Sequence, residues 1–270
     1  MSFAKKTQTI ETFPRRVGAA DTMVGVNLSL EARAPLKNLE WVNSLRISLP
    51  GADAQDDPAG GHPQITSILH IEPGADALPD DAPRMAGSVS TARSTEWFIY
   101  SESPFAEQLQ KAIGAQFPDL EVHAHAKHDP DWSVFREFLM PSPQERHLIE
   151  TRQNYEGLLS RHFQENDGLT LNHTFWFTSP EDRQDFAQSL PMEDYEAHFP
   201  DVEDEDMHPF QIPGLPAPDA DLEVEYGLMV SHYQRLQLDS LNDRVRDIYR
   251  RAMSFGGEYE GWYTPDDRGD

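Results

Sequence analysis

Two histidines in one short segment have the residue type and spacing that a metal site needs. His123 and His125 are separated by a single alanine within residues 121–126, where apolar and polar residues alternate. Side chains of a strand point alternately to its two faces, so both imidazoles are expected on one face. With a carboxylate from Asp129 or Asp131, they could hold zinc and leave a position open for a catalytic water. The alternative is an amphipathic strand that turns its histidines to solvent, and nothing in the sequence fixes the remaining ligands.

Aromatic residues stand close together near the end of the chain, in a strand that we predict over residues 258–264. Tyr259 and Trp262 are three residues apart, so regular alternation would place them on opposite faces. One ring would then belong to the core, and the other would be free to anchor a partner, as aromatic residues often do at interfaces. Gly261 between them indicates a bulge or a close approach of backbone.

A segment that is first acidic and then rich in proline covers residues 193–218. It lacks the ligand spacing and the central glycine of an EF-hand loop, so calcium binding is not favoured. We predict a solvated, exposed loop around a short edge strand near residues 198–199. Contact with a protein partner is the other role open to this charge.

The charge and composition of the chain exclude several classes of function. The 270 residues include 22 Lys and Arg against 47 Asp and Glu, which gives a formal net charge of −25. General nucleic-acid binding and docking on anionic membranes need clustered cations, whereas a basic protein partner suits such a chain. The absence of cysteine excludes disulfides, thiolate metal sites and cysteine nucleophiles. Neither a glycine-rich phosphate loop nor a Gly-x-Ser-x-Gly elbow occurs.

The N-terminal residues and the distribution of apolar residues predict a cytoplasmic protein. Residues 1–6 are followed by polar residues and not by the apolar stretch of a signal peptide. No apolar run approaches the roughly 18–20 residues that a membrane-spanning helix needs. No residue pattern calls for a cofactor, so we expect none.

The first half of the chain has the pattern of strands with one well-marked helix. Ser103-Pro104 opens this helix, because proline suits the first helical turn, and apolar residues recur at helical spacing up to Phe117. Residues 52–63 are rich in turn formers, and residues 65–71 could form either a short helix or a strand. The predicted elements are strands over residues 22–30, 41–49, 86–91, 96–100 and 121–126, and a helix over residues 103–117.

The second half alternates helices and strands. Pro141 and Pro143 interrupt any helix between the halves, so we predict two domains, residues 1–140 and 141–270. The predicted elements are helices over residues 144–163, from 179 onward and over 240–255, and strands over 169–177, near 198–199, within 222–235 and over 258–264. This βαββαβ order is that of a ferredoxin-like sandwich. We therefore expect the α+β class, with two ferredoxin-like sandwiches built on antiparallel sheets.

The end of the chain is similar to a known family. A Gly-Gly helix stop, the sequence Glu-Tyr-Glu-Gly-Trp-Tyr-Thr over residues 258–264, and an upstream strand with a central His173 resemble the protein inhibitors of ribonuclease E, regulator of ribonuclease activity B. The similarity covers about residues 144–265. His173 itself lies between apolar neighbours and is expected to be half-buried and hydrogen-bonded. The first half, through Asp129-Pro130-Asp131-Trp132, resembles the uncharacterised family 695 of domains of unknown function.

The resemblance implies a non-enzymatic regulator that binds a protein partner, with a ribonuclease E-like scaffold or another part of an RNA-decay assembly as the expected partner. It implies no direct contact with nucleic acid. The competing hypothesis is a metal-dependent hydrolase that uses His123, His125 and Asp129. The partner-binding residues that we predict are Glu258, Tyr259, Glu260 and Trp262, with Glu203, Asp204, Glu205 and Asp206 adding steering charge.

Overall fold

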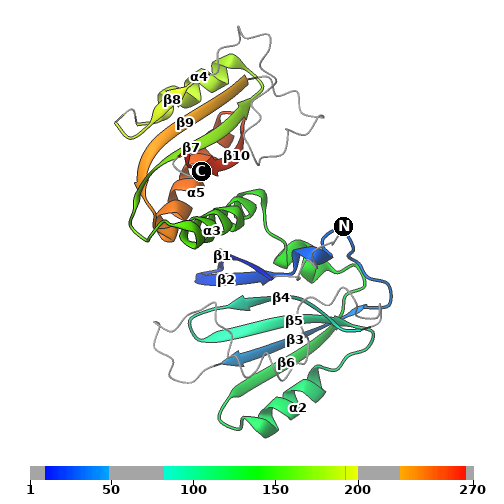
Figure 1. Cartoon of the computed structure of the whole chain (residues 1–270). Helices are drawn as coiled ribbons and strands as arrows, with labels where there is room; N and C mark the ends of the chain where they lie inside the picture. Colours follow the sequence, from blue (N-terminus) through cyan, green and yellow to red (C-terminus); the bar gives the residue numbers. More distant parts are fainter. Residues whose placement is uncertain (1–9, 49–81, 192, 200–225, 266–270) are drawn as a thin grey trace, which may run out of the picture. The chain divides into compact units, whose positions relative to one another are not determined.

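The computed structural model describes residues 10–48, 82–191, 193–199 and 226–265 (Figure 1). The chain forms two compact units, Met1–Glu145 and Arg146–Asp270. The division falls in the first turn of helix α3 (Pro143–Arg161). The predicted loop over residues 52–63, the segment 65–71 and the acidic residues 203–206 all lie outside the described residues.

The first unit is built on a six-stranded antiparallel sheet. Its strands are β1 (Glu11–Val17), β2 (Ala20–Val26), β3 (Trp41–Ser48), β4 (Arg84–Ser90), β5 (Ser94–Ser101) and β6 (Glu121–His128). Their order across the sheet is β1-β2-β4-β5-β3-β6. The α+β class and the antiparallel sheet are confirmed, but the predicted ferredoxin-like sandwich is wrong for this unit, because that fold has four strands and two crossover helices.

The difference arises at the N-terminal edge of the sheet. The sequence of β1 contains Pro14 and two arginines and does not alternate like a strand, so only β2 was expected there. Proline is tolerated in β1 because this strand forms an edge of the sheet. Gly18, with a φ of +62°, makes the turn to β2. The β1–β2 hairpin therefore extends the sheet beyond β4, a placement that local sequence pattern cannot indicate.

One face of this sheet is covered by helix α2 (Ala106–Gln116). Ile113 of the helix is fully buried and belongs to one apolar cluster with Leu45 and Ile99. The start of the helix is capped from a distant strand, because Asn43 Oδ1 accepts hydrogen bonds from the backbone N–H groups of Phe105 and Ala106, at 2.8 and 3.1 Å. Ser103-Pro104 precedes the first helical turn and does not cap it.

The second unit has the ferredoxin-like arrangement that the sequence predicts. Its strands are β7 (Gly168–Phe177), β8 (Glu196–His198), β9 (Tyr226–Arg235) and β10 (Gly257–Tyr263), in the order β10-β7-β9-β8. Helix α4 (Pro180–Ser189) connects β7 to β8, and helix α5 (Leu238–Ser254) connects β9 to β10. As in this fold, β9 lies between β7 and β8, the two strands that α4 connects, and every neighbouring pair of strands is antiparallel.

Helix ends in the second unit follow their local sequence signals. Ser179 Oγ accepts a hydrogen bond from the Asp182 N–H at 3.0 Å, with Pro180 in the first turn, as a capping serine predicts. Gly256 follows Phe255, the C-cap of α5, and its φ of +68° gives the left-handed conformation that ends the helix.

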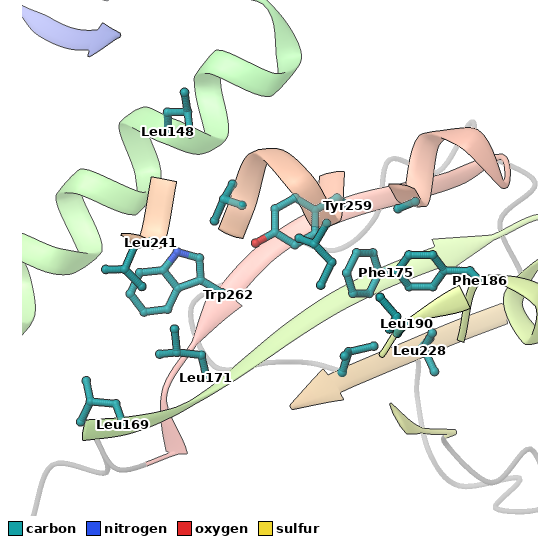
Figure 2. Packing of buried hydrophobic residues seen from close by; sticks show 14 of the residues in the cluster. Leu148, Leu169, Leu171, Phe175, Phe186, Leu190, Leu228, Leu241, Tyr259 and Trp262 are labelled. Atoms are coloured by element: carbon teal, nitrogen blue, oxygen red, sulfur yellow. The ribbon is translucent and has the colours of Figure 1, made fainter. Parts of the chain in front are cut away.

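A single apolar core joins the sheet of the second unit to its helices. Phe175 from β7, Phe186 from α4 and Leu241 from α5 are all buried, and Leu148 from α3 belongs to the same cluster. Figure 2 shows Tyr259 and Trp262 of β10 among these side chains.

Candidate functional site

The last strand contains a β-bulge next to Gly261. Tyr259 pairs with Phe175 of β7, whereas Gly261 pairs with the adjacent residue Thr174, so Glu260 is the extra residue. Gly261 has a φ of +139°, which side chains other than hydrogen rarely permit. The predicted bulge is therefore confirmed.

The bulge places the rings of Tyr259 and Trp262 on the same face of β10. Tyr259 is 3% exposed and Trp262 is 5% exposed, and both lie in the hydrophobic core (Figure 2). The expectation of opposite faces was wrong because alternation with period two holds only in an uninterrupted strand, and one extra residue reverses it. Neither ring is available as a surface anchor, which corrects their assignment as partner-binding residues.

These two aromatic residues fix β10 to its surroundings. The Trp262 indole N–H donates to Thr151 Oγ1 of α3 at 3.0 Å, and the Asn154 amide of the same helix donates to the Trp262 carbonyl at 3.2 Å. The Tyr259 hydroxyl lies 2.8 Å from His173 Nδ1. The strand is therefore held firmly between α3 and β7.

The acidic residues of β10 lie on the opposite face from the core. Glu258 is exposed, and Glu260 is half-buried beside Trp176 of β7. Burial raises the pKa of the Glu260 carboxyl, the charge of Glu258 raises it further, and the Trp176 indole acts in the opposite sense. We call Glu258 and Glu260 the outer acid pair. A cation placed beside this pair would relieve its mutual repulsion.

A pair of buried histidines lies in the helix-covered side of this sheet. His173 is 1% exposed and His232 is 4% exposed, and their rings stack at 5.0 Å with an interplanar angle of 17°. Burial lowers the pKa of His173 well below its usual value, and the neighbouring His232 and Arg244 lower it further. Burial also lowers the pKa of His232, with Arg244 acting in the same sense. His173 is hydrogen-bonded, as predicted, but fully buried instead of half-buried.

The histidines of the first unit do not form a metal centre with Asp129. His123 and His125 lie on one exposed face of β6, as their spacing predicts, and His123 Nε2 contacts Glu121 at 2.9 Å. In the parts of the chain that the structure describes, no group of three or more His, Asp or Glu side chains could hold a metal ion. The metal-dependent hydrolase hypothesis therefore has no support in this geometry.

Asp129 serves the fold of the first unit instead. Its carboxylate accepts hydrogen bonds from the Tyr100 hydroxyl at 2.5 Å and from the N–H groups of Ser133 and Val134, both at 3.0 Å. The two backbone N–H bonds lie at the start of a short π-helix, η2 (Val134–Leu139). Burial alone would raise the pKa of Asp129, but the hydrogen bonds from Ser133, Tyr100 and the backbone lower it overall.

Trp132 of the Asp-Pro-Asp-Trp motif also serves the fold of the first unit. Trp132 adopts a φ of +57° and is fully buried. Its ring stacks on Tyr100 with centroids 3.9 Å apart, and its indole N–H donates to the Leu39 carbonyl at 2.8 Å. Sequence reasoning missed this set of contacts because Tyr100 and Leu39 are distant in the chain.

These features define a two-unit α+β protein whose second unit is a ferredoxin-like domain ending in an aromatic-anchored strand. Comparison with protein families agrees with this division. Residues 11–140 match a family of unknown function, DUF695, and residues 148–264 match the family regulator of ribonuclease activity B. The predicted resemblance of both halves, in this order, is confirmed.

Other comparisons add little. No curated protein matches this chain. A crystal structure of an unknown protein from Galdieria sulphuraria is similar over 83% of this chain and 96% of its own, with 12% identity and a TM-score of 0.18. A score this low carries no argument about fold or function. Separately, none of the helices in the described ranges is long and apolar enough to cross a membrane.

Proposed function

We propose that this protein is a non-enzymatic regulator that binds a ribonuclease or an RNA-decay assembly through its second unit. The observation that carries the proposal is the match of residues 148–264 to the family regulator of ribonuclease activity B. The formal net charge of −25 supports a basic segment of such an assembly as the surface that is bound. Opposite charge on two partners acts mainly on the rate of association and on specificity.

The outer acid pair is the part of β10 that can make this contact. Glu258 is exposed and Glu260 is half-buried, while the buried side chains of Tyr259 and Trp262 hold the strand in the core. A preorganised strand loses little conformational freedom on binding, so its charges act from fixed positions. The two aromatic residues then contribute by positioning the acids and not by touching the partner.

The first experiment measures association of the full chain with a purified ribonuclease E-like scaffold from the same organism, by surface plasmon resonance. In buffer of about 50 mM salt, Glu258→Gln/Glu260→Gln should lower the association rate several-fold. The matched control is Glu181→Gln/Asp185→Asn, which removes the same charge from exposed positions of α4, outside the acidic segment. The control should retain the rate of the unchanged protein.

The second experiment is an RNA cleavage assay with the same ribonuclease. The unchanged protein should lower the cleavage rate, and the outer-acid variant should do so less effectively at equal concentration. If the protein neither binds the ribonuclease nor alters cleavage at low salt, the proposed function is wrong. If it binds and inhibits but the outer-acid variant behaves like the control, only the assignment of the outer acid pair is wrong.

A further inference from the structure

Strand β6 is an edge of the six-stranded sheet in the first unit. It pairs with β3 on one side, and within the described ranges no strand lies on its other side (Figure 1). Its apolar residues Val122, Ala124 and Ala126 are half-buried, and the intervening side chains are exposed. An unpaired edge of this length can accept a further strand.

Two hydrogen bonds show which backbone groups of β6 face this open side. The Val122 carbonyl accepts from the Gln110 side chain of α2 at 2.8 Å, so it points away from β3. The Asp129 N–H donates to the Glu40 carbonyl at 2.7 Å, so the backbone groups of the odd-numbered residues point toward β3. Because direction alternates along an antiparallel strand, Val122, Ala124 and Ala126 present their backbone groups outward.

The sequence of β6 is complementary to itself in one antiparallel register. If Ala124 faces Ala124 of a second chain, each outward backbone group meets another outward group, which is the pattern of hydrogen-bonded pairs. Facing residues also lie on the same side of the sheet, so exposed side chains meet exposed side chains. The resulting pairs are Glu121 with Lys127, Val122 with Ala126, and His123 with His125, each formed twice by symmetry.

From this complementarity we propose that two copies of this chain associate through β6. The two β6 strands pair antiparallel, with Ala124 of one copy opposite Ala124 of the other. Two Glu121–Lys127 pairs then place opposite charges next to each other across the two β6 strands. They stand at non-hydrogen-bonded positions, where side chains approach most closely. The small apolar residues allow the strands to come together. This proposal concerns the first unit and is independent of ribonuclease binding by the second.

Two contacts within the chain compete with this association. The Gln110 side chain donates a hydrogen bond to the Val122 carbonyl, and the second copy must displace it. Glu121 contacts His123 of its own strand at 2.9 Å, but both side chains are more than 60% exposed, at 68% and 63%, and such a pair stabilises little. Association should therefore be concentration-dependent and moderate in affinity. Gln110→Ala should strengthen it by exposing the carbonyl.

The test is sedimentation equilibrium of the full chain over a wide range of concentration at low salt. The unchanged protein should reach twice the 30.7 kDa mass of one chain. Lys127→Glu and Glu121→Lys should each weaken the dimer about fivefold or more, because two attractive pairs become repulsive. The double variant Glu121→Lys/Lys127→Glu should recover the affinity, since it restores opposite charges with the order reversed.

Control variants separate this edge from general charge and from misfolding. Arg16→Glu changes the charge equally at an exposed position of β1, the other edge of the same sheet, and should leave the dimer unchanged. Ala124→Pro removes an outward N–H, which an edge strand tolerates, and should abolish the dimer with an unchanged circular dichroism spectrum. A chain that stays monomeric at all concentrations overturns the proposal. So does a dimer that is insensitive to Lys127→Glu, Glu121→Lys and Ala124→Pro.

Discussion

The indole N–H of Trp262 donates a hydrogen bond to the hydroxyl of Thr151 at 3.0 Å, and both side chains are buried. This bond joins the last strand of the second unit to its first helix, over a sequence separation of 111 residues. It gives the indole N–H a partner inside the core, where the ring of Trp262 packs in the apolar cluster of the second unit.

Trp262→Phe is therefore expected to destabilise the second unit by about 2 kcal/mol, because it removes ring volume and leaves the Thr151 hydroxyl without its donor. Thr151→Val removes the other partner, and the two substitutions together should cost less than the sum of their separate effects by roughly 1 kcal/mol. The measurement is urea unfolding followed by fluorescence.

The control is Tyr233→Phe, at a residue that is 73% exposed, which should change stability by less than about 0.5 kcal/mol. Strictly additive effects of Trp262→Phe and Thr151→Val would show that the bond has no energetic role.

Gly261→Ala should destabilise the protein by about 1–3 kcal/mol. A Cβ atom at this position meets nothing within 4 Å, so the effect would come from the φ of +139° alone. Gly157 in α3 is the matched control, because a Cβ there also meets open space but the backbone is helical. Gly157→Ala should stabilise by about 0.5–1 kcal/mol. Equal effects of the two substitutions in denaturant unfolding would contradict this account of the bulge.

The buried histidine pair predicts a loss of stability in mild acid. The folded-state pKa values of His173 and His232 lie below the unfolded value of about 6.5, so the unfolded chain binds more protons as the pH falls. The contribution of these histidines is complete above pH 6.5 and is lost as the pH falls toward their folded pKa values. Urea unfolding between pH 7.5 and 5.5 should show a falling free energy of unfolding for the second unit.

Variants separate this histidine effect from other titrations. His232→Gln should reduce the slope of stability against pH, whereas His123→Gln, at an exposed histidine, should leave it unchanged. Equal slopes for the unchanged protein and His232→Gln would contradict the assignment.

Asp129→Asn should destabilise the first unit by about 2–4 kcal/mol, because the buried carboxylate accepts hydrogen bonds from Tyr100, Ser133 and Val134. Asp131→Asn, two residues away and exposed, should stay within about 0.5 kcal/mol of the unchanged protein. Thermal unfolding with and without added zinc completes the test. Stabilisation by zinc that depends on Asp129 would revive the metal-site hypothesis.

Local sequence signals were sufficient for most of the second unit. The capping Ser179, the helix-ending Gly256 and the alternating residues of β7 each act through contacts within a few residues, so the sequence alone predicts these elements and their βαββαβ order. The resemblance of both halves to known families was also evident from short motifs. The same-face placement of His123 and His125 needed only the period of a strand.

Only the tertiary structure decided the roles of the candidate residues. Tyr259 and Trp262 share the core because a bulge shifts the register, and the sequence indicates the bulge at Gly261 without indicating which ring it turns inward. The sequence offers Asp129 only as a candidate metal ligand, and the structure places it beside Tyr100, whose hydroxyl donates to its carboxylate. The six-strand order of the first unit depends on pairing between distant segments. In each case the outcome depends on contacts between residues far apart in the chain. The local sequence pattern carries no information on these contacts.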